Sequence, residues 1–115
     1  MQFLPDDERK IISRLLDDAA SAGFIVSVFD GEEWALTASS DFPAVAALVG
    51  ATDETTLRFR DPEIMNERGK PALVGFVYLV HGNGCDVISD YSDTPALSAL
   101  LAGASGVAER LAVLA

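Results

Sequence analysis

The sequence has little cysteine and little histidine: Cys85 and His81 are the only residues of these types among 115. A single cysteine excludes an intrachain disulfide and a cysteine-based zinc site, and a single histidine excludes clustered histidine ligation. A phosphate-binding loop is also lacking, because Gly82-Asn83-Gly84 has neither the lysine nor the following helix that such a loop requires. We therefore expect no metal ion and no other cofactor.

Positive charge is scarce, with 8 Lys and Arg residues against 18 Asp and Glu residues and a formal net charge of −10. Such a charge attracts basic partners and repels nucleic-acid phosphates, so we expect no direct binding of nucleic acid. One side of the folded molecule is expected to be almost purely anionic, because residues 15–57 contain no Lys, Arg or His. The acids in that interval are Asp17, Asp18, Asp30, Glu32, Glu33, Asp41, Asp53 and Glu54.

Long apolar runs are absent as well. The longest strongly apolar run, residues 72–80, is far too short to span a bilayer. The first charged residues are acidic, whereas a secretory signal begins with basic residues. We expect a cytoplasmic protein that does not bind membranes. Half of the residues are apolar, which is enough for one core, so a single domain over residues 1–115 is predicted.

The first half of the chain predicts two helices and a hairpin. Residues 5–22 have apolar residues at helical spacing and end at Gly23. Two β-like runs, residues 24–29 and 32–38, flank Asp30-Gly31, a dipeptide preferred in two-residue hairpin turns. Ser40 or Asp41 is then suited to cap a short helix that ends at Gly50.

The second half predicts three strands and a helix. Residues 55–60 alternate as a half-exposed strand, and 61–71 are expected to form a mobile loop. Residues 73–81 are apolar on both faces, which predicts a strand in the middle of the sheet, covered on both sides. A hairpin turn at Asn83-Gly84 leads into a strand over 86–91.

The chain ends in a third predicted helix, which Thr94 caps and Pro95 begins. Its apolar stripe is Leu97, Leu100, Leu101, Ala104, Ala108, Leu111 and Leu114, and Gly103 and Gly106 are suited to close packing against another element. The predicted fold class is α+β: about five mostly antiparallel strands, including two hairpins, with three helices packed mainly on one face.

The Asn83-Gly84 hairpin is a candidate catalytic site. A two-residue turn places His81 opposite Asp86, with Cys85 one residue away, which is the residue set of a cysteine nucleophile with an orienting acid. Successive strand residues point to opposite faces, so Cys85 diverges from the other two. We therefore expect no catalytic residues, and we expect His81 to pair with Asp86.

Two charge clusters suggest weaker alternatives. Asp86, Asp90 and Asp93 are candidate ligands for Ca²⁺ or Mg²⁺, but their spacing matches no EF-hand loop, so they are interpreted as a solvated face. The only basic concentration comprises Arg58, Arg60, Arg68 and Lys70, and it is expected to pair with the protein's own carboxylates.

The candidate partner-binding residues are Asp30, Glu32, Glu33 and Trp34, in the first predicted hairpin. Acids beside a tryptophan suit an anchor for a basic partner, because tryptophan is enriched at binding hot spots. Alternation also places Trp34 and Leu36 on one apolar face with Ile25 and Phe29, so the alternative is a core tryptophan.

Four segments are distinctive in order and texture: 25–34 (IVSVFDGEEW), 52–61 (TDETTLRFRD), 79–84 (LVHGNG) and 87–93 (VISDYSD). They resemble small acidic proteins of unknown function from tailed phages and prophages. The resemblance spans the chain from about Gly23 to Leu101 and implies a phage-type accessory protein, and it brings no active-site residues to carry over to this chain. The loop from Pro62 to Pro71 is longer here than such proteins lead one to expect.

The leading functional hypothesis is therefore a non-enzymatic accessory protein that binds another, basic protein. One alternative is a DNA mimic, whose carboxylates occupy the basic groove of a nucleic-acid-binding host protein. A second alternative is a small enzyme that uses Cys85 and His81. Self-association through the apolar faces, as a homodimer or as a structural component, is a further alternative.

Overall fold

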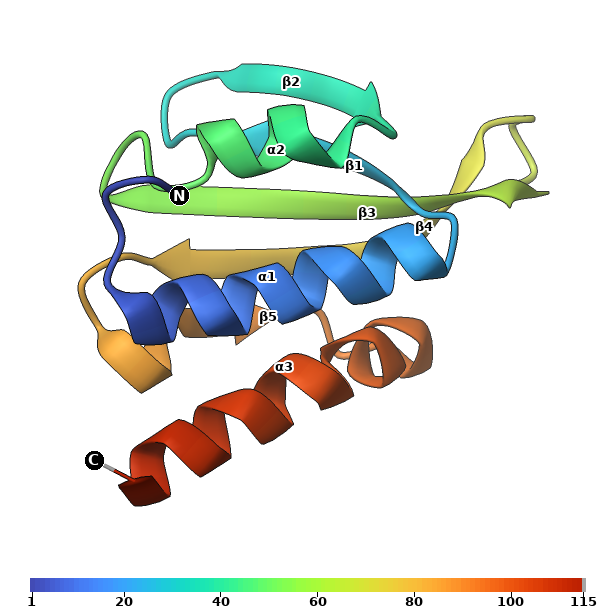
Figure 1. The fold of residues 1–115 in the computed structure, drawn as a ribbon. Helices are drawn as coiled ribbons and strands as arrows, with labels where there is room; N and C mark the ends of the chain where they lie inside the picture. Colours follow the sequence, from blue (N-terminus) through green and yellow to red (C-terminus); the bar gives the residue numbers. More distant parts are fainter. Residues whose placement is uncertain (115) are drawn as a thin grey trace.

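The computed structural model describes residues 1–114, which form three α-helices and one five-stranded antiparallel sheet. The strand order is β2-β1-β3-β4-β5, and the three helices lie on the same side of the sheet (Figure 1). The predicted α+β class is confirmed. The elements are α1 (Asp6–Ser21), β1 (Ile25–Phe29), β2 (Trp34–Ser39), α2 (Phe42–Leu48), β3 (Glu54–Met65), β4 (Pro71–Val80), the 3₁₀ turn η1 (Gly84–Asp86), β5 (Ile88–Tyr91) and α3 (Pro95–Leu114).

The first two helices match the sequence prediction closely. α1 ends before Gly23, whose φ of +76° favours glycine. The side chain of Asp41 caps α2 by accepting a hydrogen bond of 3.2 Å from the backbone N–H of Ala44. The apolar stripe of α1 is buried between the helix and the sheet, and its residues are Ile11, Ile12, Leu15, Leu16 and Ala19.

The β1–β2 hairpin is confirmed, but its loop is longer than predicted. Phe29 pairs with Trp34, so the loop comprises the four residues 30–33 and not Asp30-Gly31 alone. The register shifts between Phe29 and Val28, which pairs with Leu36. Trp34 and Leu36 therefore lie on opposite faces, contrary to the prediction, and only Leu36 packs against the core.

The predicted mobile loop over residues 61–71 is wrong. β3 continues to Met65 and pairs with Pro71, the first residue of β4, so that a turn at residues 66–70 closes a long hairpin. The Asn66 side chain accepts hydrogen bonds from the backbone of Arg68 and Lys70 and holds this turn. Proline is tolerated at such strand starts and at irregularities, and this pairing is irregular between Asp61 and Met65.

The prediction that β4 is covered on both sides is also wrong. Its helix-facing side chains Val74, Val77 and Leu79 are buried, whereas Leu73 is 49% exposed and Phe76 is 36% exposed. Gly75, with a φ of +151°, shifts the register, so Leu73 and Phe76 both face away from the helices. β3 is the central strand, and the second apolar face of β4 is left open because no helix packs there (Figure 1).

α3 begins where predicted, and the Thr94 hydroxyl accepts a hydrogen bond of 3.2 Å from the N–H of Leu97. By length and composition α3 is apolar enough to span a bilayer, a feature that the search for apolar runs missed. Its first half instead belongs to the globular core. α3 packs against α1 at Gly103, where an added Cβ would lie 2.5 Å from a carboxylate oxygen of Asp18. Gly106 makes no such close contact.

Candidate functional site

The face of the sheet opposite the helices is open, and its side chains form the candidate surface. Along β3 the residues alternate strictly: Thr55, Leu57 and Phe59 are buried under the helices, and the residues between them point the other way. We call the outward-pointing set the open face. It comprises Ile25, Phe29, Trp34, Glu54, Thr56, Arg58, Arg60, Leu73, Phe76, Tyr78, Val80 and Asp90.

Three side chains, Arg58, Trp34 and Phe29, stack on one another on the open face. The guanidinium carbon of Arg58 lies 4.3 Å from the ring centroid of Trp34, and the Trp34 ring meets Phe29 edge to face, with 5.2 Å between centroids. Burial lowers the pKa of Arg58, and the charge of Arg60 contributes to the shift. Within residues 1–114, the Arg58 Nε has no hydrogen-bond partner. The predicted pairing of Arg58 and Arg60 with the protein's own carboxylates is therefore not seen there.

The predicted acidic residues lie together in the β1–β2 loop, at the end of this surface. The Asp30 carboxylate accepts hydrogen bonds of 2.9 Å from the N–H groups of both Glu32 and Glu33. These two bonds lower the pKa of Asp30, that from Glu33 most. Asp30 thus holds the loop, which we call the acidic loop (residues 30–33), in one conformation and leaves Glu32 and Glu33 exposed.

A second acidic segment adjoins the acidic loop. The Thr52 hydroxyl contacts the carbonyl oxygen of Asp30 at 2.6 Å and that of Glu54 at 2.8 Å. Carboxylates from residues 30–33 and 53–54 therefore gather at one end of the sheet. A hydrogen bond to Glu54 is the main cause that raises the pKa of Tyr78, on the open face.

Trp34 is 40% exposed, so it belongs to the surface and not to the core. It lies where the open face meets the acidic loop. The four predicted partner-binding residues, Asp30, Glu32, Glu33 and Trp34, are thus brought together. Sequence reasoning missed the open face, because the apolar outer side of β4 was interpreted as covered.

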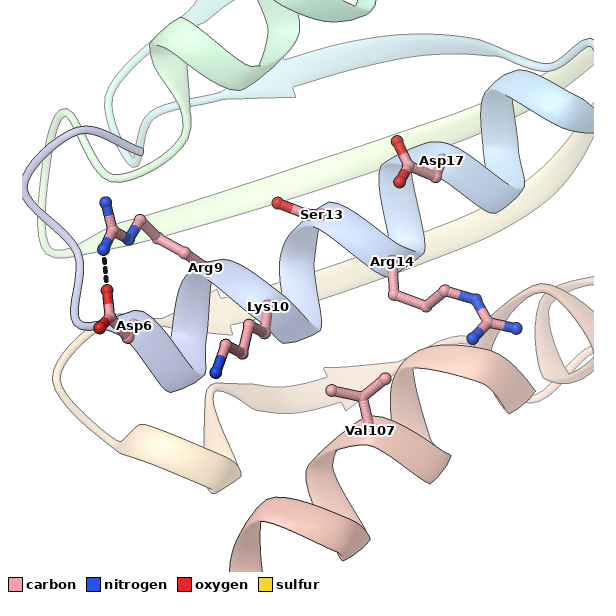
Figure 2. A pocket seen from close by; sticks show the side chains of 7 residues that line it. All are labelled: Asp6, Arg9, Lys10, Ser13, Arg14, Asp17 and Val107. Carbon is pink, nitrogen blue, oxygen red and sulfur yellow. Dashed lines mark hydrogen bonds and ion pairs between the residues drawn. The ribbon is translucent and has the colours of Figure 1, made fainter.

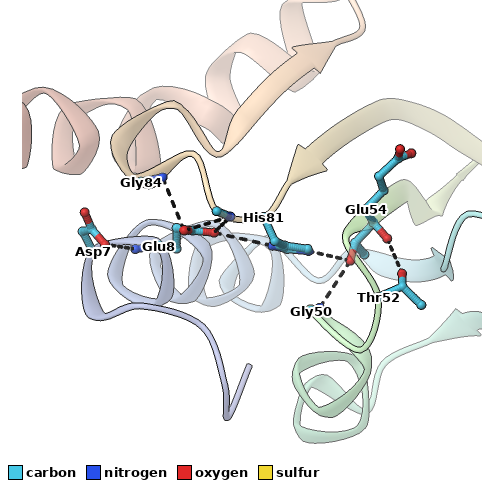
Figure 3. Close-up of polar contacts among 9 residues, drawn as sticks. Asp7, Glu8, Gly50, Thr52, Glu54, His81 and Gly84 are labelled. Atoms are coloured by element: carbon cyan, nitrogen blue, oxygen red, sulfur yellow. Dashed lines mark hydrogen bonds and ion pairs between the residues drawn. The ribbon is translucent and has the colours of Figure 1, made fainter.

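The predicted pairing of His81 with Asp86 is wrong. Residues 81–87 link β4 to β5 through the 3₁₀ turn η1, and Val80 donates its N–H to the carbonyl of Val87. The two-residue turn is lost because the N–H groups of Gly82 and Gly84 instead donate to the Glu8 carboxylate, at 3.1 and 3.3 Å (Figure 3). The turn glycines thus bind α1.

The His81 side chain lies between Glu8 and Thr55, and Figure 3 shows its contact with Glu8. Its Nε2 is 2.8 Å from the Thr55 hydroxyl, and its Nδ1 is 3.7 Å from the Glu8 carboxylate. Both contacts suit a neutral ring with hydrogen on Nδ1, because the Thr55 hydroxyl then donates to Nε2. Within residues 1–114, the polar contacts of the two ring nitrogens are thus with Thr55 and Glu8 and not with Cys85, which lies half-buried in η1.

This buried histidine makes stability depend on pH. Burial lowers the pKa of His81 below its ordinary value of 6.5, and it outweighs the Glu8 carboxylate, which raises it. The unfolded chain therefore takes up the proton first. Stability from the neutral ring is complete above pH 6.5 and is lost as the pH falls through the folded-state pKa.

We expect chemical denaturation of the wild type to show lower stability at about pH 5 than at about pH 7.5. Because carboxylates also titrate in this range, the informative quantity is the difference from His81→Gln, which should have a flatter pH dependence. Equal slopes in the two proteins would show that His81 does not contribute.

A groove of about 540 Å³ lies between α1 and α3 and contains three of the basic residues, Arg9, Lys10 and Arg14 (Figure 2). Arg9 pairs with Asp6, and Arg14 Nε donates to Asp18 at 2.9 Å. Because both arginines pair with carboxylates of their own helix, the groove offers little free positive charge. Within residues 1–114, no group of three or more His, Cys, Asp or Glu residues is placed to hold a metal ion.

No family model matches the chain, and neither does any curated protein or solved structure with which it was compared. The resemblance to phage proteins thus stays a prediction.

Proposed function

We propose that this protein is a non-enzymatic accessory protein of phage or prophage type that binds a basic protein partner through the acidic loop and Trp34. The observation that carries this proposal is the joint placement of exposed Glu32 and Glu33 beside the exposed Trp34 ring. Tryptophan supplies a rigid apolar anchor, and carboxylates guide a basic partner toward it.

The loop is suited to recognition because it is ordered before binding. The two backbone hydrogen bonds to Asp30 hold Glu32 and Glu33 in place, so little conformational entropy is lost when a partner binds. Among residues 1–114, no recorded ion pair joins these carboxylates to a base. Their charge therefore remains available to a partner.

The partner is first recovered from the native host by affinity purification and identified by mass spectrometry. The test then measures how this partner associates with a double charge-reversal variant of the present protein, Glu32→Lys with Glu33→Lys. We expect slower association and a flatter dependence of the association rate on salt, because exposed charges act mainly on encounter and are screened beyond about 8 Å at physiological ionic strength.

Glu63→Lys with Glu67→Lys is the matched control, since it changes the net charge equally in the exposed β3–β4 hairpin. The control should retain most of the association rate. An equal loss in both proteins would mean that only net charge matters, and unchanged kinetics in the acidic-loop variant would remove this loop from the interface.

A DNA mimic is the second candidate, favoured by the convergence of carboxylates from residues 30–33 and 53–54 at one end of the sheet. The partner would then be a nucleic-acid-binding protein. Duplex DNA should in that case compete with this protein for the partner, whereas a partner that binds both at once contradicts the mimic.

A further inference from the structure

The open face is apolar at its centre and carries opposite charges on the two sides of that centre. Leu73, Phe76 and Tyr78 expose apolar surface on β4, and Trp34 and Phe29 do so on β2 and β1. Aromatic residues and arginine are the residues enriched at the centres of protein interfaces. Among the described elements none covers this surface, because the three helices pack on the other side (Figure 1).

The charges follow the central strand. Arg58 and Arg60 lie on the side of Thr56 toward the β3–β4 hairpin, and Glu54 lies on the side toward the acidic loop. Thr56 pairs with Tyr78 on one neighbour and with Phe29 on the other. Glu54 and Arg58 are thus each two residues from Thr56, on the same face of the strand.

This arrangement is complementary to itself. A two-fold axis that lies in the plane of the open face, at right angles to the strands and beside Thr56, places Glu54 of one copy opposite Arg58 of the other. Sheets stacked face to face lie about 10 Å apart, a separation that arginine and glutamate side chains together bridge. An axis parallel to the strands would instead oppose Arg58 to Arg58.

We propose that the open face binds a second copy of this chain, stacked with antiparallel β3 strands so that Arg58 of each copy pairs with Glu54 of the other. The partner carboxylate offers the guanidinium of Arg58 a charged acceptor, whereas within residues 1–114 its hydrogen bond is a long one of 3.5 Å to the Ser27 hydroxyl. Phe76 and Tyr78 of both copies, which pair with Arg58 and Thr56 of β3, are buried together between the sheets. This inference does not rest on the proposed binding of a basic protein.

A second copy is favoured over an acidic foreign segment because this face carries both halves of the charge match. The net charge of −10 on each copy opposes association, but salt screens that long-range repulsion more than it weakens ion pairs at the interface. Dimer affinity should therefore hold or rise with salt, whereas binding of a basic partner to the acidic loop should weaken.

The test is sedimentation equilibrium of the full chain from about 1 to about 200 µM at about 0.15 M salt. We expect a concentration-dependent dimer. Arg58→Glu alone and Glu54→Arg alone should each lower the dimer affinity at least about tenfold, because each homodimer then opposes like charges twice. An equimolar mixture of the two variants should form a heterodimer, in which both pairs are again opposite in charge.

The matched control is Glu67→Arg with Arg68→Glu in the β3–β4 turn, which should dimerise as the wild type does. A heterodimer from two monomeric variants also shows that both are folded. A monomeric wild type throughout the range, or a mixture that stays monomeric, overturns the inference, and neither result bears on the acidic loop. If an acidic segment of another protein were the true occupant of the open face, this chain alone would remain monomeric, which also contradicts the inference.

Discussion

Replacing Leu101 by alanine is expected to lower the free energy of unfolding by about 2–5 kcal/mol, the range found when buried leucines are truncated. Leu101 is 4% exposed, and with Leu97, Leu100 and Ala104 it forms the buried part of α3. The helix packs closely against α1, where Gly103 lies next to the side chains of Arg14 and Asp18. Little collapse into the resulting cavity is therefore available.

Leu114→Ala is the matched control, because Leu114 is on the same helix but is 82% exposed. Its substitution should change stability by less than about 0.5 kcal/mol. Both variants are compared by urea denaturation with a common m-value. A loss below about 1 kcal/mol for Leu101→Ala would show that α3 is peripheral to the fold.

Replacing Glu8 by alanine is expected to cost about 3 kcal/mol, because each donor left without a partner costs about 1–3 kcal/mol. The Glu8 side chain is fully buried and accepts hydrogen bonds from Gly82 and Gly84, more than seventy residues away in the chain. It also faces His81. One carboxylate at the start of α1 thus joins the helix to the β4–β5 loop, with further stabilisation from the helix dipole.

Two further variants separate the causes of this loss. Glu8→Gln keeps the shape and one acceptor oxygen, so its cost should be smaller than that of alanine. Glu109→Ala removes an exposed helical carboxylate and should have little effect on stability. If Glu8→Ala were as stable as Glu109→Ala, the contacts to residues 82 and 84 would not stabilise the fold.

The buried position of Glu8 can be read from the sequence. Glu8 stands three, four and seven residues before Ile11, Ile12 and Leu15, so helical periodicity alone places it on the buried face. Glu8 is also one of three acids in the first turn of α1, where carboxylates suit the positive end of the helix dipole. A single acid aligned with an apolar stripe predicts a buried carboxylate that needs donors, although it does not say which donors.

The sequence by itself determined the helices, the helix caps and the strands other than the second half of β3, because these depend on residues close together in the chain. Periodicity and the capping by Asp41 and Thr94 act within a few residues. It also grouped Asp30, Glu32, Glu33 and Trp34 in one hairpin. The local sequence did not determine the turn lengths, since the N–H groups of residues 82 and 84 donate to Glu8 on a helix distant in the chain.

Only the tertiary structure decided which apolar surface is covered. Residues 73–80 are apolar on both sides. That pattern fits a strand between two layers as well as a strand with one solvent-exposed apolar face. The choice depends on where the three helices pack, and all three lie on one side, where α1 contacts both α2 and α3. Arg58 lies over Trp34, and Arg58 and Glu54 lie on either side of Thr56 on the open face. The first of these placements follows from the strand register between distant segments, which the local sequence does not encode.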